Sequence, residues 1–298
     1  MKRTLTVNID LDDIRYYRGI HALPARPEQA EIFTSALPRF LDLCEEYGIK
    51  ATLFVIACDL DLPQARAAIA DAATRGHEIA SHTVSHDYGV SLADDKTIDD
   101  ELRNSKIRLS EVSGQDVCGF RGPGYNLSDR ILAGLVRAGY LYDTSIMSSP
   151  PYWMARAAII MAMKVTGRKS ASIVGRGRDF FRGDKPFAWQ GAGAGLMEFP
   201  ITASGPLRMP LIGTTLAASG LAVRQMVAAS ARKDFVNIEF HGIDFLDREQ
   251  DGLEPELLVE PALKIPLDLR MKNFRTHLDL LARDRDKPSL AALNRASR

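Results

Sequence analysis

The N-terminal stretch alternates between apolar and polar residues, a period of two that predicts a β-strand with one buried face. The apolar positions are Leu5, Val7, Ile9 and Leu11, and the polar positions are Thr6, Asn8, Asp10 and Asp12. Asp10 and Asp12 therefore point to one side of the strand, and Asp13 faces away if the strand continues. Like charges on one face repel each other, so a cation beside them would stabilise the pair. The alternative is a solvent-facing strand end.

Strand-like and helix-like patterns then alternate along most of the chain. Predicted strands cover residues 50–56, 78–81, 117–120, 197–200 and 235–240, and residues 140–145 begin a further unit. Predicted helices cover residues 28–48, 64–75, 94–113, 128–138, 217–233 and 267–283, the last closing the chain, with a loop over 14–27. Pro38 could divide the first helix into two pieces. This order is typical of parallel crossover units, whose functional residues gather at the C-terminal ends of the strands.

Residues 150–186 interrupt this alternation. They contain eight Lys or Arg against two Asp, with Tyr152, Trp153 and an apolar run over 157–163. A basic segment with an aromatic and an apolar face is typical of helices at a membrane interface, whereas the alternative is a barrel helix followed by a solvated loop. We interpret residues 1–298 as one domain that carries a basic amphipathic insertion at about 150–186.

Composition narrows the function classes. The 38 basic and 38 acidic residues balance, so no overall field indicates a nucleic-acid partner. A hydrophobic content of 46% argues against disorder. The three cysteines are odd in number and lack metal spacing, which favours reduced thiols. Neither a signal peptide nor an apolar run of roughly 20 residues is evident, so a cytoplasmic location is expected.

His82 and His86 stand four residues apart, directly after a predicted strand. On a helical turn they would share one face and could bind one ion. Neutral imidazole is a common zinc ligand, and a carboxylate from the N-terminal strand would leave open positions for water and substrate. A chance pair of exposed histidines is the alternative. Two further strand ends carry charged residues, namely Arg121, before a Gly-Pro-Gly turn, and His241.

These motifs, in this order, resemble the polysaccharide deacetylase family (carbohydrate esterase family 4) over roughly residues 4–246. The segment from His82 to His86 fits the family's H-[ST]-x-x-[SH] motif, and the segment from Phe120 to Tyr125 resembles its R-x-P-G-Y turn. Residues 8–12 depart from the commoner T-F-D-D-G and are similar to the D-x-D variant of intracellular members. Those members include the lipid-linked aminoarabinose deformylase and the allantoinase-like group. The resemblance implies an α/β fold, a distorted (β/α) barrel of about seven parallel strands.

The resemblance also implies roles for the site residues. Asp10 would be the general base, oriented by Arg121, and His241 the general acid. The ligands of a divalent metal, expected to be Zn²⁺, would be Asp12, His82 and His86, with Asp13 replacing Asp12 if the strand bends. We expect Tyr125 and Asp143 to line the substrate groove. The remaining candidates are Asp244, which would tune His241 or cap a turn, His21, which could approach substrate, and His77 and His277, interpreted as surface or packing residues.

The predicted function is removal of an N-acetyl or N-formyl group from an amino sugar. The D-x-D resemblance and the basic insertion together raise the hypothesis that this sugar is carried on a lipid. The enzyme would then contact the cytoplasmic face of the inner membrane. Two alternatives remain, a hydrolase of a non-sugar amide such as a ureide, and a metal-dependent carbohydrate-binding protein without catalysis.

Overall fold

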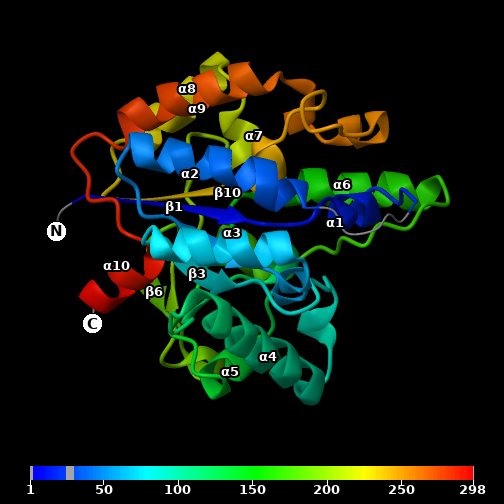
Figure 1. Ribbon diagram of the computed structural model, residues 1–298, viewed down its shortest axis with the longest axis vertical. Coiled ribbons are helices and arrows are strands. Elements are labelled where there is room, and N and C mark those ends of the chain that lie inside the picture. The colour runs from blue at the N-terminus through cyan, green and yellow to red at the C-terminus, as the bar shows by residue number, and fades with distance from the viewer. Residues whose placement is uncertain (1–2, 25–29, 298) are drawn as a thin grey trace.

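A computed structural model describes residues 3–24 and 30–297 (Figure 1). Its main sheet contains β1 (Thr4–Asp10), β2 (Thr52–Val55), β3 (Glu78–Ser81), β4 (Gly119–Phe120), β5 (Tyr142–Asp143), β6 (Phe187–Ala188), β7 (Met197–Glu198) and β10 (Phe235–His241), and β8 (Ala203–Ser204) and β9 (Met209–Pro210) form a hairpin. Its α-helices are α1 (Ile14–Ile20), α2 (Leu37–Glu46), α3 (Pro63–Thr74), α4 (Asp95–Ser113), α5 (Asp129–Arg137), α6 (Pro150–Val165), α7 (Gly213–Leu216), α8 (Leu221–Ser230), α9 (Leu267–Leu281) and α10 (Leu290–Ala296).

The main sheet has the strand order β10-β1-β2-β3-β4-β5-β7-β6. Within the described residues seven of these strands run parallel, and only the edge strand β6 is antiparallel to its neighbour. The sheet curls until the segment after β7 reaches β10, where Thr202 N donates to Asn237 O at 3.0 Å. The predicted fold, a distorted barrel of about seven parallel strands, is confirmed.

The two faces of the sheet have different chemistry. On β1 the apolar residues Leu5, Val7 and Ile9 belong to the main hydrophobic cluster, which the covering helices share. The polar residues between them face the barrel interior, where Asn8 Nδ2 donates to Asn237 Oδ1 at 2.6 Å. The period of two predicted from the sequence is therefore real, and it gives the barrel a polar interior.

Several predicted helices are confirmed, and two of them begin with a side-chain cap. The Asp94 side chain accepts from Thr97 N at the start of α4, and the Ser128 side chain accepts from Ile131 N at the start of α5. The predicted helix over 28–48 is divided, because a π-helix (η1, Ile32–Ala36) precedes α2 and Pro38 stands in the first turn of α2. Its predicted start at Glu28 lies outside the described residues.

Three predictions about elements were wrong. Residues 14–20 form helix α1 rather than a loop, because the Asp13 carboxylate caps it by accepting from Arg15 N at 2.8 Å. The helix predicted over 217–233 is shorter, since α8 spans Leu221–Ser230. The chain does not close with the helix over 267–283, because α10 follows α9. Leu290 and Ala291 of α10 are buried in one cluster with Phe54 and Tyr142. Leu290 N donates to Thr52 Oγ1 and Ala291 N to Glu78 Oε2, at the first residues of β2 and β3.

The insertion divides into two parts with different surroundings. Helix α6 extends past the carboxyl end of β1, beside α1 (Figure 1). Only Trp153 and Met163 of this helix are buried. The segment after α6 turns back through a 3₁₀ turn (η5, Gly177–Phe181) and leads into the edge strand β6. Three arginines of this second part, Arg176, Arg178 and Arg182, therefore contact residues of α5 or β6 and do not lie along α6.

Candidate active site

The predicted site residues come from strands that are neighbours in the sheet. Asp10 ends β1, His82 follows β3, Arg121 follows β4 and His241 ends β10. The register of the β1–β10 pair sets Asp10 directly opposite His241. Because all these strands are parallel, their carboxyl ends meet at one rim, and residues more than 200 positions apart become neighbours.

The two histidines converge through a loop, so the expected helical turn between them was wrong. Residues 82–86 contain no helix. Instead, Thr83 and His86 adopt left-handed backbone angles, with φ of 67° and 57°. His86 N donates to Thr83 Oγ1 at 3.0 Å, which fixes the turn. Left-handed angles at non-glycine residues cost energy and cluster at functional sites, and here they bring the two Nε2 atoms to 3.2 Å.

Asp12 joins the two histidines in a compact set of three donor atoms. Asp12 Oδ1 lies 3.5 Å from His82 Nε2 and 3.5 Å from His86 Nε2, and all three residues are buried. Ligands about 2.0–2.1 Å from a tetrahedral zinc ion stand roughly 3.3 Å apart, so these separations fit one such ion. One of these three ligand atoms, Asp12 Oδ1, has no hydrogen-bond partner among the described residues. A bound cation would satisfy this oxygen.

Electrostatics and outer contacts prepare the three side chains for a cation. Burial raises the pKa of Asp12 well above its usual value and lowers the pKa values of His82 and His86, so without a cation all three favour their neutral forms. His82 Nδ1 lies 2.7 Å from Arg121 O, and a donated proton there leaves Nε2 free to ligate. His86 Nδ1 is buried without a hydrogen-bond partner in the part of the chain that the structure describes.

Asp13 is occupied elsewhere. Its carboxylate caps α1, whereas Asp12 is the acidic residue gathered with His82 and His86. The turn from β1 into α1 therefore separates two adjacent aspartates that the sequence alone left as alternatives.

Asp10 and Arg121 form a buried ion pair beside these donors. Arg121 Nη1 donates to Asp10 Oδ1 at 2.5 Å, and the same guanidinium donates to Asn8 Oδ1 and Thr144 O. Its charged plane also lies 4.2 Å from the centre of the Phe54 ring. Burial alone would raise the pKa of Asp10, but the charges of Arg121, His82 and His241 and the hydrogen bond from Arg121 together outweigh it and lower that pKa, which favours the ionised carboxylate. The second oxygen, Asp10 Oδ2, lies 3.7 Å from His82 Nε2.

Glu239 is a site residue that the sequence analysis missed. It is fully buried on β10, two positions before His241, and its Oε1 lies 3.3 Å from His241 Nε2. Tyr125 OH donates to the same oxygen at 2.6 Å. The signal was present in the sequence, because Asn237, Glu239 and His241 alternate with apolar residues as Asn8, Asp10 and Asp12 do on the partner strand.

The two predicted groove residues differ in position. Tyr125 reaches the site, with its hydroxyl 3.5 Å from His241 Nε2. Asp143 is fully buried at the end of β5, where its Oδ1 accepts from Ser145 Oγ at 2.6 Å and its pKa is raised by burial. This burial leaves Asp143 no surface for substrate in the described structure and gives it a supporting position under the rim.

The remaining candidates have structural partners. Asp244 Oδ2 accepts from His241 N at 2.8 Å within a capping box, so it caps the turn after β10. His21 pairs with Glu260 at 2.5 Å. His77 and His277 are buried packing residues, which hydrogen-bond to Ala51 N and Ala218 O, respectively.

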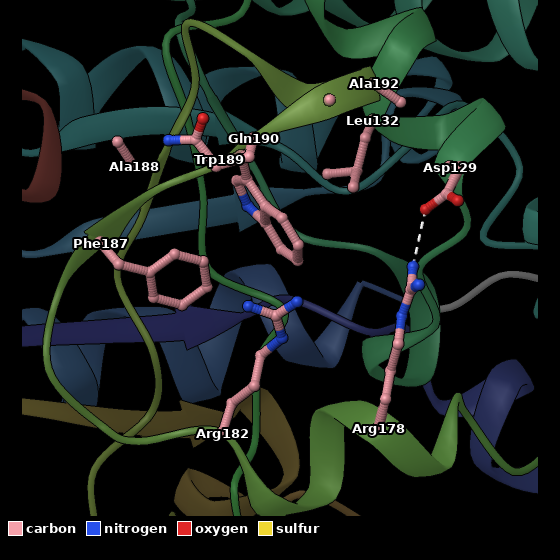
Figure 2. Close-up of a pocket in the computed structure, with 10 residues that line it drawn as sticks. Asp129, Leu132, Arg178, Arg182, Phe187, Ala188, Trp189, Gln190 and Ala192 are labelled. Atoms are coloured by element: carbon pink, nitrogen blue, oxygen red, sulfur yellow. Dashed lines mark hydrogen bonds and ion pairs between the residues drawn. The ribbon is translucent and has the colours of Figure 1, made fainter.

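A separate hollow of about 290 Å³ lies where the second part of the insertion meets α5 and β6. Arg182 points into it over the rings of Phe187 and Trp189, at 5.1 and 4.7 Å from their centres (Figure 2). Arg178 Nη2 donates to Asp129 Oδ1 at 2.7 Å on the other side (Figure 2). These cations are engaged with protein groups. Part of the basic charge of the insertion is therefore paired with protein groups.

Comparisons with known proteins identify relatives of this chain. The polysaccharide deacetylase family profile matches residues 27–142. The chain is similar to a peptidoglycan deacetylase of Helicobacter pylori, with 25% identity over 153 residues, covering 49% of this chain and 51% of the relative. It is also similar to a peptidoglycan-N-acetylglucosamine deacetylase of Bacillus cereus, with 30% identity over 103 residues, covering 35% and 46%. The chain thus spans about half the length of the curated relatives it matches.

A solved structure shares the fold over nearly the whole chain. It is a candidate polysaccharide deacetylase from Mycobacterium smegmatis, with a TM-score of 0.64 and 17% identity, covering 99% of this chain and 91% of that chain. At this identity the likeness concerns the fold, and it extends the shared architecture beyond residue 142 to the strand that carries His241.

Proposed function

This chain belongs to the polysaccharide deacetylase family, and from that premise we propose that it is a metal-dependent hydrolase that removes an N-acyl group from an amino sugar. One observation carries the proposal. Three buried donor atoms spaced for one ion lie beside an aspartate that is paired with a buried arginine. A metal site next to a poised base is the arrangement that amide hydrolysis by water requires.

The mechanism assigns a task to each side chain. A divalent ion held by Asp12, His82 and His86 would supply Lewis acidity, which promotes ionisation of a water and stabilises charge on the acyl oxygen. Asp10 takes a proton from the attacking water. Arg121 occupies Asp10 Oδ1, so Oδ2, which faces His82, is the oxygen that accepts it. His241 gives a proton to the departing nitrogen as the C–N bond breaks, and the products are a carboxylic acid and a free amine.

Metal analysis and an activity screen test this proposal together. We expect about one equivalent of divalent metal, zinc being the proposed ion because two imidazoles and one carboxylate suit it. The loaded protein should release acetate or formate from N-acetyl or N-formyl amino sugars. A protein that holds its metal and yet releases neither acid from any amino sugar would refute the assignment.

We further propose that the amino sugar is carried on a lipid and that α6 rests on an anionic membrane surface. Four large apolar side chains of α6 are mainly solvent-exposed, between 55% and 79%: Met154, Ile159, Met161 and Val165. Exposed cations follow at its C-terminal end, at Lys164, Arg168 and Lys169. An apolar face edged by cations suits the boundary of anionic headgroups. No helix among the described residues is both long and apolar enough to cross a membrane.

Helix α6, which carries this apolar surface, contacts the turn that contains Tyr125. Trp153 of α6 packs against Tyr125, with ring centres 6.4 Å apart, and Arg156 Nη1 donates to Gly124 O at 3.0 Å. A membrane surface under α6 would therefore lie next to the rim that carries the site, where a sugar projecting from a lipid could enter.

Vesicle co-sedimentation tests the membrane proposal. Each cation near anionic headgroups contributes about 1 kcal/mol, so neutralising Lys164, Arg168 and Lys169 together should weaken binding about a hundredfold. Arg178→Gln is the matched control, because that cation is paired with Asp129 at the hollow and should leave binding unchanged. Equal behaviour of the intact protein on neutral and anionic vesicles at low salt would favour a soluble sugar instead.

A further inference from the structure

We propose that Arg156 of α6 binds an acidic group of the substrate, a phosphate or a carboxylate attached to the amino sugar. The inference rests on the proposed N-acyl hydrolysis and narrows its substrate class from amino sugars in general to acidic ones. The Arg156 side chain is half-buried beside the turn that carries Tyr125. It is a cation that the protein fixes next to the candidate site and pairs only with neutral groups.

The contacts that fix Arg156 orient its charge but do not neutralise it. Nε donates to Ser172 Oγ at 2.8 Å, and Nη1 donates to Gly124 O at 3.0 Å. The guanidinium carbon lies 5.4 Å from the centre of the Trp153 ring and 5.9 Å from the centre of the Tyr88 ring. In the part of the chain that the structure describes, no carboxylate forms an ion pair with Arg156. A full positive charge therefore remains at this place.

Arginines of neighbouring elements differ in this respect. Arg121 is paired with Asp10, and Arg18 of α1 is paired with Glu254. A guanidinium held away from bulk water usually has an opposite charge beside it, because its desolvation is costly. Its planar fork binds phosphate and carboxylate oxygens through charge-assisted hydrogen bonds. An acidic group on a bound ligand would supply the partner that Arg156 lacks.

Two aromatic residues relate Arg156 to the candidate site. The Tyr88 ring, which Arg156 contacts, also packs edge-on against the imidazole of His86, with ring centres 5.0 Å apart. Gly124, whose carbonyl accepts from Arg156, directly precedes Tyr125, whose hydroxyl reaches the site. Arg156 is therefore one contact away from a candidate metal ligand and one residue away from a candidate substrate-binding side chain. Substituents of a sugar bound with its N-acyl group at the metal donors would lie beside it.

The backbone around Arg156 is shaped to hold it. Gly124 has a φ of 57°, a left-handed value that favours glycine. A Cβ at this position would lie 2.5 Å from Arg156 Nη2 and 2.7 Å from Tyr88 Cδ1, so only glycine allows this approach. On the other side Ser172 is held near α1, because Ser170 Oγ donates to the last carbonyl of that helix at 2.8 Å. The guanidinium is thus pre-organised, and a ligand need not order it on binding.

Ligand-observed NMR titrations of the metal-loaded protein test the inference with three soluble sugars. N-acetylglucosamine carries no acid group, N-acetylglucosamine 1-phosphate carries a phosphate, and N-acetylmuramic acid carries a carboxylate. At least one acidic sugar should bind the wild-type protein about tenfold or more tightly than the neutral sugar. Arg156→Gln should abolish this preference and leave both the neutral-sugar affinity and the metal content unchanged. The acidic sugar that gains most from Arg156 identifies the acid group.

Two further variants control for charge and packing. Arg156→Lys keeps the cation and should retain part of the preference. Arg178→Gln removes another cation of the insertion, one paired with Asp129, and should retain all of it.

Two results would overturn the inference. In the first, neither acidic sugar binds the wild-type protein more tightly than the neutral one. In the second, Arg156→Gln weakens all three sugars equally, which would make Arg156 a packing residue. The same spectra show any acetate that is released. A preference that depends on Arg156 without acetate release would support the acid-binding role and refute only the proposed hydrolysis.

Discussion

Replacing each of the two inward aspartates by asparagine should separate the base from the metal ligand. Asp10→Asn keeps the shape of the side chain but cannot accept the proton of water, so kcat should fall by about 10²–10⁴. Metal content should remain close to one equivalent, because Asp10 is bonded to Arg121 and is not one of the three closely spaced donors.

The structure sets the expected stability cost of Asp10→Asn. The asparagine still offers Arg121 a neutral oxygen, and Arg121 keeps Asn8 Oδ1 and Thr144 O. The loss is therefore that of one charge-assisted hydrogen bond, about 2 kcal/mol, or roughly 3 °C in Tm for a chain of this length. A typical domain has 5–15 kcal/mol of stability, so the variant stays folded and unfolding cannot explain the loss of activity.

Asp12→Asn should behave in the opposite way. Burial already raises the pKa of Asp12, and its Oδ1 has no hydrogen-bond partner in the described part of the chain. The metal-free variant should therefore unfold at or above the wild-type temperature, while metal binding and turnover are lost.

The pKa of Asp10 is lower in the folded protein than its unfolded-state value near 3.9. Its carboxylate therefore stabilises the fold above about pH 3.9, and this contribution should be lost as the pH falls below that value and through the lower folded-state pKa.

Plasma emission analysis of metal, differential scanning calorimetry and a steady-state assay on the same preparations provide the three readouts. If Asp10→Asn released the metal while Asp12→Asn retained it, the two roles would be reversed. If both variants kept metal and full turnover, the rim would not be the active site.

Further outcomes follow from the same geometry. His82→Ala or His86→Ala should lose both metal and turnover with the circular dichroism spectrum unchanged, and full metal occupancy in either would contradict the ligand assignment. Chelation should lower Tm by several degrees, because an ion at a hundred times its Kd contributes about 2.7 kcal/mol, and an unchanged Tm would argue against a site in the folded state. Gly213→Ala should destabilise the protein by about 1–3 kcal/mol, since an added Cβ would lie 1.8 Å from Asp244 Oδ2. That oxygen accepts the hydrogen bond from His241 N. An unchanged melting temperature would show that Asp244 can move without cost.

The sequence by itself determined the layout of the barrel and most of its rim. A period of two along β1 and β10 records which residues face inward, because a strand exposes alternate side chains to alternate faces. The carboxyl ends of parallel strands meet, so the order of Asp10, His82, Arg121 and His241 along the chain was enough to predict that they gather.

Only the tertiary structure decided the contacts that depend on chain reversals and on packing between distant segments. After the turn into α1, Asp13 caps that helix, whereas Asp12 lies with the two histidines. Left-handed backbone angles, and not a helix, bring those histidines together. The hydrogen bond from Tyr125 OH to Glu239 forms only in the folded protein, because Tyr125 follows a different strand. Composition made the insertion look uniformly basic, yet Asp129 neutralises Arg178 only once the chain has folded back. Such pairings depend on which surfaces approach each other, and local patterns in a sequence carry no record of that approach.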